Sequence, residues 1–116
     1  MILIKLGILF AVLSVIIGAF GAHGLESTIK DKMEIYKTGV QYQMFHSLAL
    51  VAVGILSITL SKDLNDVGYI FSLGIVLFSG SLYLIAVKKL SFLGMVTPFG
   101  GALFIVGWAL LLYKLA

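Results

Sequence analysis

The sequence predicts an all-α integral membrane protein, a four-helix bundle that crosses the bilayer up, down, up and down as one domain, residues 1–116. Hydrophobic residues make up 61% of the 116 positions and charged residues 11%, whereas an ordinary globular domain is ~25% charged. A small domain cannot hide that much apolar surface from water. Four long apolar stretches, joined by short connections, explain the composition as antiparallel membrane helices.

The four predicted spans run from about Leu6 to Leu25, Thr38 to Leu60, Val67 to Val87 and Leu90 to Tyr113. Each reaches the ~20 residues that a helix needs to cross the hydrocarbon core. None contains Lys, Asp or Glu. The first stretch has an alternative as a secretory signal, but signal cores are usually ~7 to 15 residues long. We therefore predict that it is a retained span.

The segment between the first two spans is amphipathic. Leu25, Ile29, Met33 and Tyr36 recur at helical spacing, and the opposite face carries the charged residues Glu26, Lys30, Asp31, Lys32 and Glu34. This pattern predicts a short helix lying at the membrane interface. A solvated loop is the alternative.

The lysines of the loops predict the orientation. Lys30, Lys32, Lys37, Lys88 and Lys89 lie on one side of the predicted bundle, and Lys5, Lys62 and Lys114 lie on the other. Because cytoplasmic loops carry the excess of positive residues, we expect a multi-pass protein of the cytoplasmic membrane with both termini outside the cytoplasm.

Small residues predict where the helices pack closely, because in lipid they let backbones approach one another. Span one offers a pair, Gly7 and Ala11, and a row of Ser14, Gly18 and Ala22 with Gly21 alongside; span four offers Gly94, Gly100, Gly101, Ala102 and Gly107. Pro98 lies about a third of the way along span four, where it predicts a kink.

Polar residues inside the spans fall at similar predicted depths. Counting 1.5 Å per residue inward from the loop ends at Lys37, Lys88 and Lys89 places three of them about 12 to 14 Å below that surface, namely His46, Ser79 and Thr97. Two tyrosines and a glutamine lie slightly nearer to the same surface. We predict that these side chains face inward as one polar layer, because unpaired polar groups in hydrocarbon are costly. The layer either joins the helices by hydrogen bonds or binds a ligand. Its members are Tyr42, Gln43, His46, Ser79, Tyr83 and Thr97, and a further histidine, His23, is expected at the interface.

Several function classes are disfavoured. The chain has no Cys and no carboxylate inside a span, which argues against disulfide chemistry and against cation-coupled export of the small multidrug type. The two histidines differ in predicted depth by ~10 Å, which argues against bis-histidine haem and against a metal site. The net charge of +3 is dispersed, which argues against nucleic-acid binding. We expect no enzyme activity, no cofactor and no metal.

Four motifs together carry a family resemblance: residues 18–24 (GAFGAHG), 38–46 (TGVQYQMFH), 78–83 (FSGSLY) and 97–101 (TPFGG). The chain resembles the family known as domain of unknown function 423, small bacterial membrane proteins that are similar to eukaryotic transmembrane protein 256. The resemblance covers nearly the whole chain. It implies a four-helix protein of a bacterial cytoplasmic membrane and assigns no catalytic role.

The leading functional hypothesis is a non-enzymatic binding or scaffold protein. Its polar layer would take a lipid or another amphipathic small molecule, or steady a surface for a partner membrane protein or a second copy. The alternative is a small transporter or proton-linked carrier using His46, which would need a wet path joining both surfaces. We expect the Lys62 half to be blocked by Ile55, Leu56, Ile58, Leu60, Ile70, Phe71 and Leu73.

Overall fold

The computed structural model describes residues 1–116, and helices form all of its regular structure. The elements, with short 3₁₀ segments marked η, are α1 (Ile2–His23), α2 (Glu26–Ile29), η1 (Lys30–Lys32), α3 (Met33–Leu60), α4 (Asn65–Lys88), η2 (Ser91–Met95) and α5 (Thr97–Leu115). Four helical segments, 2–23, 26–60, 65–88 and 91–115, are long and apolar enough to cross a membrane. The predicted all-α membrane class, with four helices long enough to cross a bilayer, is confirmed.

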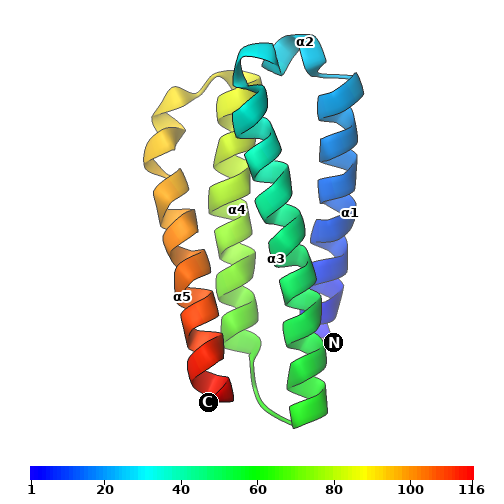
Figure 1. Cartoon of the computed structure of the whole chain (residues 1–116), viewed down its shortest axis with the longest axis vertical. Coiled ribbons are helices and arrows are strands. Elements are labelled where there is room, and N and C mark those ends of the chain that lie inside the picture. Colours follow the sequence, from blue (N-terminus) through cyan, green and yellow to red (C-terminus); the bar gives the residue numbers. More distant parts are fainter.

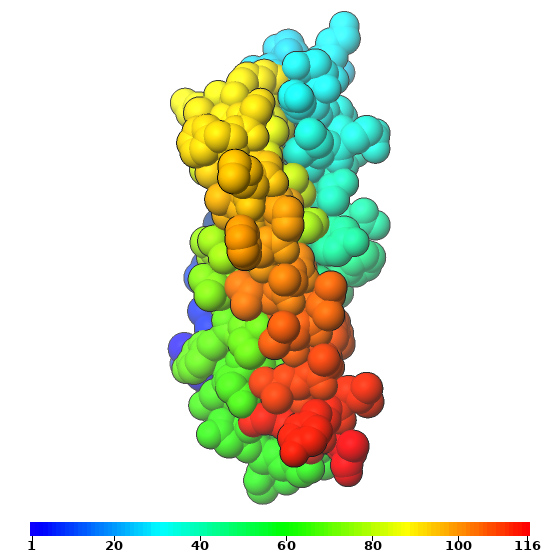
Figure 2. Space-filling view, turned by 90° about the vertical axis from the view of Figure 1, so that its left-hand side faces the viewer, coloured from blue at the N-terminus to red at the C-terminus, as the bar shows by residue number.

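The four long helices pack in chain order. α1 contacts α3, α3 contacts α4, and α4 contacts α5, which leaves α1 and α5 at opposite edges (Figure 1). The Cα atoms extend over 48 × 26 × 17 Å, so the bundle is flattened. Figure 2 shows α5 running along its edge without another segment covering it. Both outer helices therefore present long apolar faces, as expected where the surroundings are lipid.

The connection between α1 and α3 keeps the predicted amphipathic pattern in a different form. Ile29 and Tyr36 are buried, Leu25 and Met33 are half-buried, and most of the charged side chains are exposed. The segment is one α-turn, a 3₁₀ turn and then the first turn of α3, which begins at Met33. The expected single helix is thus divided, and its last part extends a span.

Span four differs from the prediction at Pro98. The chain leaves α4 through Lys89, whose φ of 58° ends the helix, continues through η2, and starts a new helix at Thr97. Pro98 occupies the first turn of α5, where its missing N–H has no intrahelical partner to lose. The predicted kink inside a continuous helix is wrong, because Pro98 begins the helix.

The close helix contacts use small residues spaced by seven. In α1 the buried members are Gly7, Ser14 and Gly21, while Gly18 and Ala11 are half-buried and Ala22 is exposed. A Cβ added at Gly7 would lie 2.7 Å from the Ser47 carbonyl oxygen, so the two backbones nearly touch. In span four, Gly100 and Gly107 are buried, Gly101 is half-buried, and Gly94 and Ala102 are exposed. A period of seven is typical of left-handed helix packing.

Apolar side chains fill the half of the bundle next to Lys62. The buried ones include Leu50, Val53, Leu64, Val67 and Phe71. Of the residues predicted to block this half, only Phe71 lies inside; Ile55, Ile58, Leu60 and Leu73 are exposed, and Leu56 and Ile70 are half-buried. The interior is therefore packed as expected, but mostly by other residues, because the count along each helix did not determine which face turns inward.

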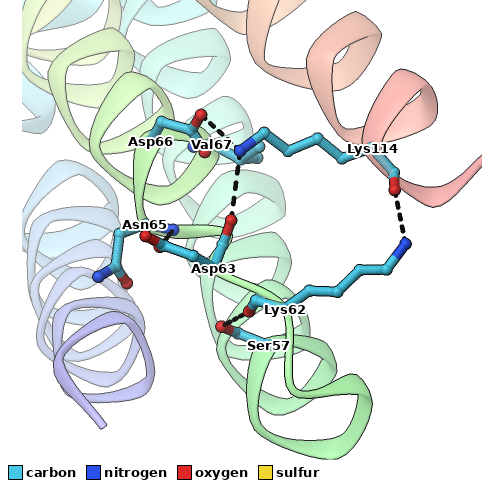
Figure 3. Close-up of polar contacts among 7 residues, drawn as sticks. All are labelled: Ser57, Lys62, Asp63, Asn65, Asp66, Val67 and Lys114. Carbon is cyan, nitrogen blue, oxygen red and sulfur yellow. Dashed lines mark hydrogen bonds and ion pairs between the residues drawn. The ribbon is translucent and has the colours of Figure 1, made fainter.

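Ion pairs hold both ends of the bundle. At the Lys62 end, the Lys114 ammonium lies 2.6 Å from the Asp66 carboxylate and donates to the Asp63 carbonyl, and Lys62 donates to the Lys114 carbonyl (Figure 3). At the other end, Lys89 donates to the Asp31 carboxylate at 2.6 Å. This hydrogen bond holds the pKa of Asp31, which lies in the connection between α1 and α3, below its usual value.

Candidate functional site

The six residues of the predicted polar layer separate into distinct hydrogen-bonded groups. Gln43 and Tyr83 join helices α1, α3 and α4. Ser79 and Thr97 each bond to another residue of the protein. Tyr42 and His46 line an aromatic groove between α3, α4 and α5. The prediction of inward-facing polar side chains is right for Gln43, His46 and Ser79, which are buried. Their arrangement as one continuous layer is not observed.

Gln43 links three helices with one side chain. Its Oε1 accepts a hydrogen bond from the Tyr83 hydroxyl on α4 at 2.6 Å, and its Nε2 donates to the Phe10 carbonyl of α1 at 2.8 Å. The residue is 3% exposed. Because a buried amide needs partners for both its ends, Gln43 and Tyr83 form an interhelical connection in which the oxygen and the nitrogen of the amide each have a partner.

Ser79 and Thr97 also find partners within the protein. The Ser79 hydroxyl donates to the Gly39 carbonyl of α3 at 2.6 Å. Thr97 shares a hydrogen bond of 2.6 Å with Ser81, which ties the start of α5 to α4. Sequence reasoning missed Ser81 as this partner. These contacts hold helices together.

His46 is fixed by partners on two helices. Its Nδ1 lies 2.9 Å from the Tyr42 carbonyl, and the indole N–H of Trp108 on α5 donates to its Nε2 at 3.0 Å. A carbonyl can only accept and an indole N–H can only donate. The imidazole must therefore carry its proton on Nδ1, and a second proton on Nε2 would face the Trp108 N–H. Both ring nitrogens of His46 therefore have a partner within the protein.

Aromatic rings surround His46. Its ring is stacked on Phe104 with centroids 3.7 Å apart, and the ring of Phe71 meets it edge-on at 5.3 Å. The Tyr42 ring lies 4.7 Å from that of Phe78. The Phe71 and Tyr42 contacts have the separations at which edge-on and tilted aromatic pairs are favourable. Together with the Phe104 contact, they assemble side chains from three helices into one aromatic cluster.

An open groove of about 500 Å³ runs along this cluster between α3, α4 and α5. Its lining is mostly apolar, and it includes Tyr42, His46, Phe78, Pro98, Gly101, Ala102, Phe104, Ile105 and Trp108. His46 and Trp108 are bonded to each other, whereas no hydrogen bond of the Tyr42 hydroxyl is present in the structure. Concave apolar surface with a few polar groups is typical of small-molecule sites.

Trp108 is the hydrogen-bonding residue of this groove that sequence reasoning missed, together with the apolar Phe104 and Ile105. It lies on α5 and is 47% exposed, beside a buried histidine of α3. The available signal was chemical, because an indole N–H inside a span needs an acceptor, and His46 is the only histidine well inside a predicted span, since His23 lies near the end of the first. His23, by contrast, is exposed in the last turn of α1, at the end of the bundle where it was predicted.

Comparison with known proteins identifies the family. A profile described as "Protein of unknown function (DUF423)" matches residues 17–101. The chain belongs to this family. A relative, the UPF0382 membrane protein YwdK of Bacillus subtilis, is 48% identical over 111 residues, which cover 93% of this chain and 90% of the relative. A UPF0382 membrane protein of Staphylococcus haemolyticus is 48% identical over 94% of this chain and 90% of the relative. A UPF0382 membrane protein of Staphylococcus saprophyticus is 49% identical over 93% of this chain and 91% of the relative.

The family resemblance of the four sequence motifs is thus confirmed, and so is the membrane class. No solved structure is significantly similar to the chain. Three motifs of the resemblance supply residues of the aromatic groove, namely Tyr42 and His46, Phe78, and Pro98 with Gly101.

Proposed function

We propose that this DUF423 protein is a non-enzymatic protein of the cell membrane that binds an amphipathic ligand carrying a flat ring. The observation that carries the proposal is the aromatic groove, where rings from three helices line about 500 Å³ of open space. A planar ligand ring can stack on Tyr42 or Phe78, and each such contact adds to the stabilisation from buried area. Its polar group has one free partner, the Tyr42 hydroxyl.

The chemistry of the groove favours binding over reaction. The His46 nitrogens both have partners, so no base is free to accept a proton from a ligand. The hydroxyls of Ser79 and Ser81 are engaged with a backbone carbonyl and with Thr97. A nucleophile needs a neighbouring base to become reactive, and neither serine has one among its hydrogen-bond partners.

The alternative of a proton-linked carrier using His46 has weaker support. Protonation would place two donors against each other at the Trp108 contact, and the carrier would need Trp108 to move away in every cycle. A wet path would also have to cross the packed apolar residues next to Lys62. A ligand that enters the groove sideways from the bilayer meets neither obstacle.

Native mass spectrometry of protein extracted gently from its own membrane tests the proposal. Two matched substitutions on α5 separate the groove from the general lipid surface. Ala102→Leu adds bulk to a residue of the groove, and Ala109→Leu adds the same bulk two turns away at an exposed residue outside it. Tyr42→Phe removes the one free hydroxyl.

We expect a retained small molecule in the unchanged protein and in Ala109→Leu, and its loss in Ala102→Leu. Tyr42→Phe should weaken retention by about fivefold, because a net hydrogen bond is worth about 1 kcal/mol. Equal retention in both leucine variants would refute the groove as the site. A protein that is bare in every case, or that carries only a second copy or a partner subunit, would also refute the proposal.

A further inference from the structure

A second groove lies at the other side of the bundle, between the last turns of α1 and the first turns of α3. It has a volume of about 410 Å³, and its lining combines small or apolar residues with charged ones. Gly18, Val40 and Gln41 lie towards the bilayer centre, and Glu26 and Lys37 lie around the end next to the α1–α3 connection. This groove shares no lining residue with the aromatic groove.

Two contacts hold the groove open. The Tyr36 ring packs against Gly21, where a Cβ would overlap it, and the Tyr36 hydroxyl donates to the Ile17 carbonyl. The ring therefore forms one wall and fixes the separation of α1 and α3. Because both contacts lie inside the protein, the groove does not depend on an occupant for its shape.

The charged residues of this groove have no partners in the protein. Lys37 and Glu26 line the same space, yet neither takes part in the two ion pairs of the structure or in any of its side-chain hydrogen bonds. The other charged pairs at the ends of the bundle, Asp31 with Lys89 and Asp66 with Lys114, are formed. One cation and one anion thus face a single cavity without contacting each other.

The depths of the residues match a membrane lipid. Gly18 lies five residues below His23, the end of α1, which is about 7 to 8 Å along the helix, and Val40 lies about 4 to 5 Å deeper than Lys37. The charged end is therefore at the level of lipid headgroups, and the apolar end reaches the level of acyl chains. An occupant must be amphipathic along the same axis as the bilayer lipids.

We propose that this groove binds one phospholipid whose headgroup carries both a phosphate and a primary ammonium, as in phosphatidylethanolamine. The phosphate pairs with Lys37, the ammonium donates to Glu26, and an acyl chain lies along Gly18 and Val40. Charge-assisted hydrogen bonds of this kind are stronger than neutral ones. An anionic headgroup without an ammonium would leave Glu26 unpaired next to a negative charge, and a quaternary ammonium has no N–H to donate.

The test uses the full-length protein in nanodiscs of equal parts phosphatidylethanolamine, phosphatidylcholine and phosphatidylglycerol, with native mass spectrometry of the lipid retained on ejection. Glu26→Gln removes the partner of the ammonium and keeps the size of the side chain. Lys37→Met removes the partner of the phosphate. Lys5→Met is the matched control, because Lys5 is an exposed lysine at the opposite end of the bundle.

We expect the unchanged protein and Lys5→Met to retain phosphatidylethanolamine about fivefold over the other two lipids, the change that one exposed ion pair of about 1 kcal/mol produces. Glu26→Gln should lose this preference but still retain phospholipid, and Lys37→Met should retain less of all three. Ala102→Leu should keep the preference, so that a failure of the aromatic groove does not affect this result.

Two results would overturn the inference. One is a preference for phosphatidylglycerol, or no preference, in the unchanged protein. The other is a preference for phosphatidylethanolamine that persists in Glu26→Gln. A second copy of the chain seated in place of the lipid would appear as a dimer mass without retained lipid, and this outcome would also overturn it.

Discussion

Replacing Gln43 by Leu removes the only side chain that hydrogen-bonds to both α1 and α4 from α3. Gln43 makes one bond to Tyr83 and one to the Phe10 carbonyl, and Leu fills a similar volume. Interhelical hydrogen bonds in membranes average about 0.6 kcal/mol, and the orphaned Tyr83 hydroxyl costs about 1 kcal/mol more. We expect Gln43→Leu to lower the free energy of unfolding by about 2 kcal/mol, and Tyr83→Phe to lower it by about 1 kcal/mol.

The assay is a double-mutant cycle, measured by reversible unfolding in mixed micelles or bicelles. If the 2.6 Å contact between Gln43 and Tyr83 is a direct bond, the double variant should be less destabilised than the sum of the single variants. The coupling energy should be about 1 to 2 kcal/mol, because the cost of the orphaned partner that each single variant carries is absent from the double variant. Tyr42→Phe combined with Gln43→Leu is the control and should be additive, because the Tyr42 hydroxyl has no partner. Additivity of the Gln43 and Tyr83 changes would refute the reasoning.

Two further predictions concern packing and orientation. Gly7→Ala should lower the free energy of unfolding by about 1 to 3 kcal/mol, because the new Cβ meets the backbone of α3. Gly80→Ala should be neutral or stabilising by up to about 1 kcal/mol, since nothing lies within 4 Å of a Cβ there. Equal effects of the two changes in the same unfolding assay would contradict this. For orientation, single cysteine variants can be labelled without background, because the chain has no Cys. A membrane-impermeant maleimide should label Asn65→Cys in intact cells, and it should label Ser27→Cys only after permeabilisation. The reverse pattern would place both termini in the cytoplasm.

The sequence predicted the fold class well because that class depends on composition and length. Four apolar stretches of sufficient length and three short connections permit few arrangements. The boundaries were less accurate where polar residues continue a helix, as at Met33, or where the chain changes helix type after Lys89. There the backbone depends on local contacts, such as the left-handed conformation of Lys89, which hydropathy does not report.

The candidate site was predicted only in part, because the sequence does not report how each helix is rotated about its own axis. A count of residues gives the depth of a side chain along a helix, but not the direction in which the helix turns it. His46 was therefore placed near Ser79 and Thr97 by depth, although its partner is Trp108 across the groove. The small residues of α1 show the same limit. Ala11 and Ser14 both lie on the helix face of Gly7, but only Ser14 is buried, because the way α1 crosses α3 decides which of the two packs against it.

The flattened order of the helices accounts for both proposed sites. Each outer helix has one main neighbour, so a groove remains beside the junctions of α3 with α1 and of α4 with α5. The interior near Lys62 is closed by apolar packing and by the ion pair of Lys114 (Figure 3), whereas both grooves open sideways. Amphipathic molecules already dissolved in the bilayer can enter such grooves without a water-filled path. With both proposed sites in place, the protein would exchange its ligands with the membrane itself, so a change in the lipid composition of the membrane should alter which ligand is retained.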